Sequence, residues 1–273
     1  MISTILAATD GSGGSASAER FAVALAEGVR ARIVGISVVE ERFTRGFAED
    51  GLGVAPPSAE PLSNYLRARA EAASRRVAER ARDAGVESSA EVLQGVADDR
   101  VVERGQQVDL IALGRDGQGA AFRTGLIGST SNGIIRKTAK SSLLVPASAE
   151  LPGPLLLAFD GSPGSRIAAK LAVEIATRLG AAIHVFVDSK DKGRARARFE
   201  EVRGLMGGLP LPVQEISSTL GRPDVKIVDA AREARAGLIV MGAYARNRIT
   251  EYFLGSNAAA VARTSPIAVL LAR

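Results

Sequence analysis

The sequence predicts an α/β fold of two tandem domains, each a five-stranded parallel sheet with helices on both faces. Short apolar runs alternate strictly with helix-like segments, which is typical of a buried parallel sheet. The pattern occurs twice, because residues 2–10 (ISTILAATD) match residues 152–160 (PGPLLLAFD) and both lead into Gly-Ser and an Ala-rich amphipathic segment. The fourth apolar run of each half ends in glycine, and the loop after it closes on Gly-Ser before a helix, at 109–130 and again at 237–257.

The elements follow in the same order in both halves. In the first half we expect strands near 4–9, 32–39, 88–93, 109–113 and 142–146, and helices near 15–29, 60–84, 97–107 and 129–139. In the second half we expect strands near 154–159, 181–187, 211–217, 237–241 and 266–271, and helices near 164–179, 191–207, 223–235 and 255–264. The boundary is expected near residues 149–152, which gives domains of residues 1–149 and 150–273.

The spacing of the repeats locates an insertion. Asp10 and Asp160 are 150 residues apart and Val38 and Val187 are 149 apart, whereas Gly95 and Gly221 are only 126 apart. Roughly 23 extra residues therefore lie in the first half, and the segment 41–63, with Pro56-Pro57 and several glycines, is the natural place for them. We expect a long loop or lid beside the site.

Composition narrows the class of protein. The chain has 273 residues, of which 46% are hydrophobic and 24% charged, and its apolar runs are of strand length, so we expect a cytoplasmic protein without a membrane partner. It begins directly with a strand-like run and has no cysteine, which excludes disulfides and thiolate metal sites. The net charge of +5 comes from arginines spread among acidic residues, and only 4% of residues are aromatic, so no nucleic-acid partner is expected.

The glycine loop at 109–130 has the pattern of a phosphate site. Glycine lets backbone N–H groups approach an anion, and the N-terminus of the following helix adds partial positive charge. Asp10 and Asp160 end the first strand of each half, where a carboxylate can accept hydrogen bonds from a ribose or cap its own Asp-Gly-Ser turn.

Other kinds of site fit the sequence less well. Residues 11–16 match the dinucleotide pattern G-x-G-x-x-A, with Glu40 in the place of a ribose-binding acid, but the second copy has Pro163 where the second glycine should stand. No G-x-x-x-x-G-K-[ST] motif or metal-ligand spacing is present, and the single histidine, His184, lies inside an apolar run. No catalytic or metal-binding residue is therefore predicted.

Taken together, these residues resemble the tandem universal stress proteins over nearly the whole chain. Members of that family that bind ATP carry G-x2-G-x9-G-[ST] after the fourth strand of a Rossmann-like five-stranded sheet. The first half has Gly114, Gly117 and Gly128-Ser129, with ten residues instead of nine in the last gap. The second half has Gly242, then Ala245 in place of a glycine, then Gly255-Ser256 at the family spacing.

The resemblance implies an adenine-nucleotide site in each half. In the first half the implied binding residues are Asp10, Val38, Leu113, Gly114, Gly117, Gly128, Ser129 and Thr130. In the second half they are Asp160, Val187, Met241, Gly242, Ala245, Gly255, Ser256 and Asn257. The aspartates would lie near the nucleotide, the valines, Leu113 and Met241 would line the adenine pocket, and the glycine loops would hold ribose and phosphates.

The expected function is that of an ATP-binding stress-response regulator that is not primarily catalytic, with ATP, with or without Mg²⁺, or another adenine nucleotide as ligand. Two alternatives stay open: a slow ATP hydrolase, and a degenerate binding or dimerisation module for another small ligand. The first site is favoured because Ala245 adds a methyl group in the second. The last strands, 142–145 and 267–271, are apolar edges that would pair within the chain to form a pseudo-dimer, with a homodimer as a further expectation.

Overall fold

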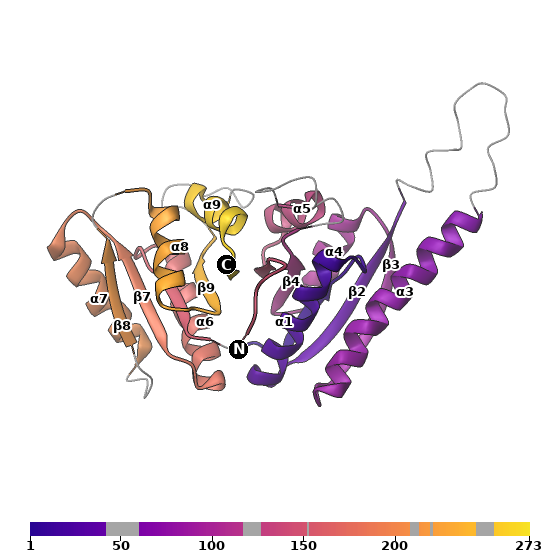
Figure 1. Ribbon diagram of the computed structural model, residues 1–273, viewed down its shortest axis with the longest axis horizontal. Helices are drawn as coiled ribbons and strands as arrows, with labels where there is room; N and C mark the ends of the chain where they lie inside the picture. The colour runs from indigo at the N-terminus through magenta and orange to yellow at the C-terminus, as the bar shows by residue number, and fades with distance from the viewer. Residues whose placement is uncertain (42–59, 117–126, 152, 208–212, 219–220, 244–253) are drawn as a thin grey trace, which may run out of the picture.

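The computed structural model is one continuous sheet with helices on both faces, and its two halves lie side by side (Figure 1). It describes residues 1–41, 60–116, 127–151, 153–207, 213–218, 221–243 and 254–273. The strands are β1 (Thr4–Ala8), β2 (Arg32–Glu40), β3 (Ser88–Gly95), β4 (Leu110–Gly114), β5 (Ser141–Val145), β6 (Leu155–Ala158), β7 (Ile183–Asp188), β8 (Val213–Ser218), β9 (Leu238–Gly242) and β10 (Ala268–Ala272). The helices are α1 (Gly13–Val29), α3 (Glu60–Asp83), α4 (Ala97–Gly105), α5 (Ser129–Lys137), α6 (Pro163–Leu179), α7 (Lys192–Met206), α8 (Pro223–Glu233) and α9 (Ser256–Thr264).

The strand order is β3-β2-β1-β4-β5-β10-β9-β6-β7-β8. All neighbours within each half run parallel, which confirms the predicted fold class. The two last strands join the halves by antiparallel pairing, with Val269 opposite Leu144 and Leu271 opposite Ser142. Since this pairing covers the apolar edges that both halves would otherwise expose, it is the intramolecular pseudo-dimer expected from the sequence.

Apolar side chains form a core on each face of the sheet. On one face, fully buried residues such as Leu25 of α1 and Ile175 of α6 pack on the strands. On the other face, Ile134 of α5 and Val261 of α9 do the same. The strands are apolar on both sides because helices cover both sides, as the continuous apolar runs indicate.

Serine side chains start the helix that follows the first strand of each half. The Ser12 hydroxyl accepts the N–H of Ser15 at the start of α1, and the Ser162 hydroxyl accepts that of Ser165 at the start of α6. Each serine satisfies one of the N–H groups that a helix start leaves without an intrahelical partner.

Arginines also tie the two halves together. Arg115, which follows β4, donates from Nη1 to the carbonyl of Ser265 at the end of α9 at 2.5 Å. Arg273, which follows β10, donates to the carbonyl of Thr138 at the end of α5 at 2.7 Å. Each guanidinium thus lies at the negative end of a helix in the other half, where a cation is stabilising.

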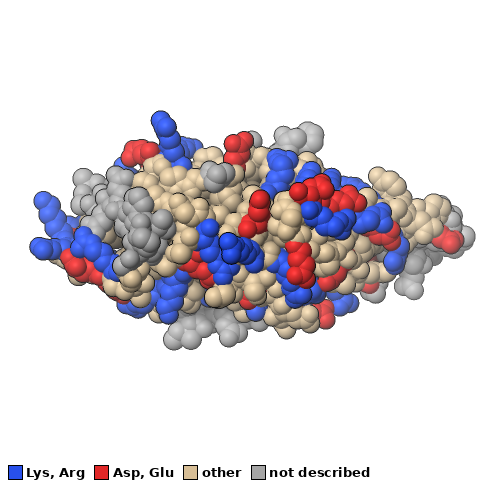
Figure 2. All heavy atoms as spheres, turned by 90° about the horizontal axis from the view of Figure 1, so that it is seen from below, with Lys and Arg blue, Asp and Glu red and all other residues tan. Residues whose placement is uncertain are grey.

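The insertion predicted at 41–63 falls mostly on residues 42–59, which lie outside the described residues. Its last four residues, 60–63, belong to the first turn of α3. Among the described helices, none is long and apolar enough to cross a membrane. On the face seen in Figure 2, Lys and Arg lie among Asp and Glu.

Candidate functional site

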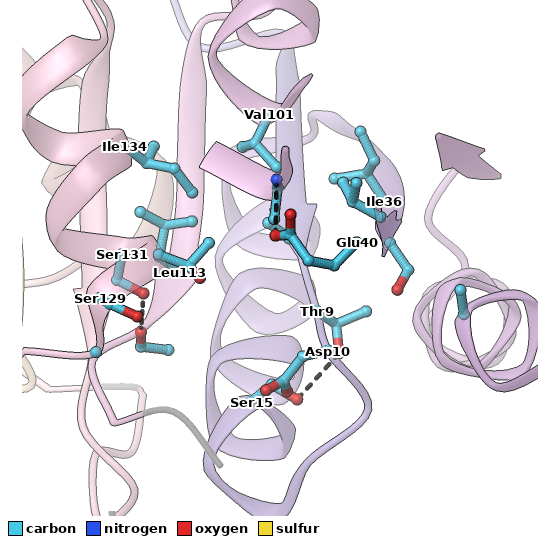
Figure 3. A pocket seen from close by; sticks show the side chains of 18 of the residues that line it. Thr9, Asp10, Ser15, Ile36, Glu40, Val101, Leu113, Ser129, Ser131 and Ile134 are labelled. Atoms are coloured by element: carbon cyan, nitrogen blue, oxygen red, sulfur yellow. Dashed lines mark hydrogen bonds between the residues drawn. The ribbon is translucent and has the colours of Figure 1, made fainter. Parts of the chain in front are cut away.

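A cavity of about 440 Å³ opens at the carboxyl ends of β1, β2 and β4 in the first half (Figure 3). This is the edge at which open parallel sheets bind ligands, and the volume is that of a small-molecule site. Helix α3 adds a wall on one side, and the start of α5 adds a wall on another. The site is therefore built by elements distant in the sequence.

One part of the cavity is apolar. Ile36 of β2, Leu113 of β4, Val101 of α4 and Ile134 of α5 reach it, and all four belong to the core on the α4 and α5 face. Ile36 is fully buried and Ile134 is 1% exposed, so this wall is rigid core and not loose surface. A flat apolar group such as a nucleobase suits such a wall.

Another part is the N-terminus of α5, which opens into the cavity. Gly128 is the N-cap of this helix and no described side chain caps it, while Ser129, Thr130 and Ser131 form its first turn. The Gly128 N–H donates to the carbonyl of Arg115 at 2.8 Å, and the Ser131 hydroxyl donates to the carbonyl of Gly114 at 2.7 Å, so the turn is held against the end of β4. Uncapped N–H groups at a helix start attract anions.

Asp10 lies between these walls (Figure 3). Its Oδ1 accepts the N–H of Ser12 at 2.9 Å, and Gly11 has a φ of +75°, so the carboxylate closes its own turn at a position that favours glycine. The second carboxylate oxygen stays available to a ligand. Both interpretations of this residue, turn-former and ligand acceptor, are compatible with the geometry.

Beneath the cavity lies a buried ionic cluster that sequence reasoning missed. Glu19 of α1 is 1% exposed and accepts hydrogen bonds from Arg76 at 2.5 Å and from Arg80 at 2.6 Å, both on α3. It also accepts the hydroxyl of Thr9, which lines the cavity, at 2.5 Å. The hydrogen bond to Glu19 raises the pKa of Arg76, against the effect of burial, and the charges of Glu19 and Asp10 add to this.

The cavity collects most of the residues predicted in the first half. Asp10, Val38, Leu113, Gly114, Gly128, Ser129 and Thr130 all line it, and Gly117 lies outside the described residues. Several lining residues were not predicted as binding residues: Thr9, Ser15, Leu66, Arg69, Ala70, Asp116 and Ser131. A ligand role for any of these side chains stays a prediction.

The second half repeats the turn, because Asp160 Oδ1 accepts the N–H of Ser162 at 2.9 Å and Gly161 has a φ of +72°. Met241 and Gly242 end β9, and Gly255, Ser256 and Asn257 start α9, as the repeat predicts. Ala245 lies outside the described residues.

Val187 does not occupy the place in β7 that Val38 occupies in β2, and its binding role stays a prediction. In the first half Ala8 pairs with Ile36, and in the second half Ala158 pairs with Phe186, so Asp188 is the counterpart of Val38. Val187 is fully buried in the core on the α6 face, on the opposite side of the sheet. The repeat offset of 149 residues was one short, and a shift of one residue turns a strand side chain to the other face.

The two strand edges also differ in how closely the backbone packs. A Cβ built on Gly114 would lie 3.1 Å from the carbonyl oxygen of Gly14, whereas a Cβ on Gly242 would lie 2.7 Å from the carbonyl carbon of Gly164. The end of β9 therefore lies closer to the first turn of α6 than β4 does to α1. Among the described residues, no group of His, Asp or Glu side chains has the arrangement of a metal site.

Comparisons with known proteins agree with this architecture. A universal stress protein of Mycobacterium tuberculosis is 28% identical over 194 residues, which is 63% of this chain and 64% of the relative. One of Synechocystis is 29% identical over 175 residues, which is 60% of this chain and 58% of the relative. The matched regions thus span less than two thirds of these curated relatives.

Solved structures match over the whole length. The crystal structure of a universal stress protein from Archaeoglobus fulgidus has a TM-score of 0.77 at 21% identity and covers 99% of this chain and 98% of that one. A putative universal stress protein from Pseudomonas aeruginosa has a TM-score of 0.59 at 16% identity, with 100% and 93% covered. At these identities the likeness shows the fold alone. The sequence model of the universal stress protein family matches residues 1–146 and again 153–273, so the chain belongs to the universal stress protein family with two copies of its domain.

Proposed function

We propose that this chain binds an adenine nucleotide in the cavity of the first half and acts as a stress-response regulator whose nucleotide is a signal and not a substrate. ATP is the proposed ligand. The observation that carries the proposal is that one cavity offers an apolar wall and the uncapped start of α5 together. A nucleotide has the matching parts, a flat base and an anionic phosphate.

Family membership supports the proposal, because the glycine pattern Gly114, Gly117, Gly128-Ser129 differs from that of its ATP-binding members only by one extra residue in the last gap. Asp10 suits the ribose, since its free carboxylate oxygen can accept a hydroxyl. If Mg²⁺ accompanies ATP, it would be held mainly by the phosphates and water, as Mg²⁺ usually is.

Titration calorimetry on the whole chain tests the proposal. Thr130 lies in the first turn of α5 and lines the cavity, so Thr130→Asp places a carboxylate where the phosphates would bind. Asp in the first turn stabilises a helix by itself, so lost binding would not report unfolding. We expect the variant to bind ATP at least about tenfold more weakly than the wild type, because it replaces a favourable charge interaction with repulsion.

Asn257→Asp is the matched control, because Asn257 holds the same place in the first turn of α9. It should leave ATP binding at the first cavity unchanged. Release of inorganic phosphate, measured in the same samples, separates the regulator from the slow hydrolase. No heat and no thermal stabilisation of the wild type at millimolar ATP would refute nucleotide binding.

A further inference from the structure

Arg69 of α3 lines the cavity from the wall that the sequence did not predict. It is half-buried, and its Nη2 donates to the carbonyl oxygen of Asp10 at 3.3 Å. A Cβ built on Gly11 would lie 3.9 Å from its Nε, so the guanidinium rests against the turn that carries Asp10. This arginine is therefore held at the cavity edge by the backbone.

Three other arginines of α3 have carboxylate partners. Arg75 pairs with Glu71, and Arg76 and Arg80 pair with Glu19. Within the described part of the chain, the one polar contact of Arg69 is that long backbone hydrogen bond. A guanidinium has five N–H donors, so most of those on Arg69 remain available to a ligand.

The other charged side chains that the structure describes around the cavity are acidic. Three carboxylates line the described part of the wall, those of Asp10, Glu40 and Asp116. Asp116 is neutralised by Arg115, with N–O distances of 2.9 and 3.0 Å, and Glu40 accepts the N–H of Ala97 at 3.1 Å. Arg69 is the single cationic side chain among the described lining residues. Without it, a phosphate beside Asp10 would meet a like charge and no cationic side chain among the described residues of the wall.

The second half places an arginine against the same turn. A Cβ on Gly161 would collide with the guanidinium of Arg198, which lies on α7. Arg69 and Arg198 are 129 residues apart, whereas Gly95 and Gly221, which follow the two helices, are 126 apart, so the two arginines hold different positions on their helices. In both halves, however, an arginine from the helix after the second strand lies against the turn that ends the first strand.

We infer that Arg69 binds a phosphate group of the nucleotide, so that α3 and the start of α5 both contact the anionic part of the ligand. The inference rests on the proposed function and adds the residue that distinguishes a nucleotide from a nucleoside. Arginine is suited to this role because its planar fork presents parallel donors to phosphate oxygens.

The test compares adenosine, AMP and ATP by titration calorimetry on the whole chain. Arg69→Gln should weaken AMP and ATP about tenfold while adenosine changes less than about twofold, because only the phosphate loses a charge-assisted hydrogen bond. Arg69→Lys keeps the positive charge, so it should keep part of the affinity difference between the phosphorylated ligands and adenosine. Arg67→Gln, an exposed position on the same helix outside the cavity, is the matched control and should bind as the wild type does.

If the wild type binds nucleotide, two results would overturn the inference while leaving the proposed function intact. In the first, Arg69→Gln changes no affinity. In the second, it weakens the binding of adenosine as much as that of AMP. The second pattern would mean that Arg69 only holds the Asp10 turn in place. If the wild type binds none of the three ligands, the proposed function itself fails and the inference fails with it.

Discussion

Replacing Glu19 by alanine should destabilise the first half strongly, although no ligand is involved. The carboxylate is 1% exposed and serves two guanidinium groups and the hydroxyl of Thr9. Alanine removes the carboxylate that pairs with Arg76 and Arg80 and accepts the hydroxyl of Thr9. At the repeat position in α6 the chain has Ala169, fully buried, so alanine itself fits a helix in this place.

The loss of stability depends on how well water can hydrate the two arginines once the carboxylate is removed. Breaking a buried ion pair costs about 3–5 kcal/mol when the remaining charge stays buried. Here the side chains of Arg76 and Arg80 are 36% and 33% exposed, so they can be hydrated after the loss. We therefore expect the lower end of that range, about 3 kcal/mol, including about 1 kcal/mol for the lost hydrogen bond from the Thr9 hydroxyl.

Urea unfolding followed by circular dichroism measures this loss. Glu200→Ala is the control, because Glu200 forms an exposed i,i+3 pair with Arg203, with side chains 58% and 54% exposed. That pair should contribute less than about 0.5 kcal/mol. If Glu19→Ala costs less than about 1 kcal/mol, or no more than Glu200→Ala, the cluster is not the stabilising feature described above.

Two further predictions concern the repeat and pH. Gly242→Ala should destabilise the fold by about 1–3 kcal/mol, because the added methyl would lie 2.7 Å from the backbone of Gly164. Gly114→Ala should cost clearly less, because its methyl would lie 3.1 Å from the backbone of Gly14, a close contact that a small shift relieves. Equal losses in thermal unfolding would contradict this. The hydrogen bond from Arg222 holds the pKa of Asp224 below its usual value, against the effect of burial. A lowered pKa stabilises the fold above the ordinary aspartate pKa of about 4 and loses that effect as the pH falls through the lowered value. Asp224→Asn should therefore be less stable than the wild type at pH 6, with the difference closing as the pH falls below the ordinary aspartate pKa. A difference that does not change with pH would argue against this.

The sheet could be predicted from the sequence because each strand is marked by a short stretch of neighbouring residues. Runs such as Leu110–Gly114 are short, apolar and ended by glycine, and the repetition of the pattern supports each assignment twice. The pairing of β5 with β10 could be expected since both are apolar and would otherwise be edges.

The residues that the sequence did not indicate, and the place of Val187 in its strand, depend on register and on distant packing. Val187 was misplaced because adjacent strand residues face opposite sides, so the repeat must be aligned to the residue. Arg69 reaches the cavity from a helix beyond an insertion, and no local pattern reports that. Glu19 did leave a signal: it lies four residues after Ser15 on the buried face of α1, where a charge requires a partner.

A crystal structure of the whole chain grown with saturating ATP would show directly where the nucleotide binds. We expect it in the first-half cavity, with the base against Ile36 and Val101. Its phosphate oxygens should lie within hydrogen-bond distance of the N–H groups of residues 129–131, and Arg69 should contact a phosphate. A cavity without nucleotide, or a nucleotide bound only elsewhere on the protein, would contradict it.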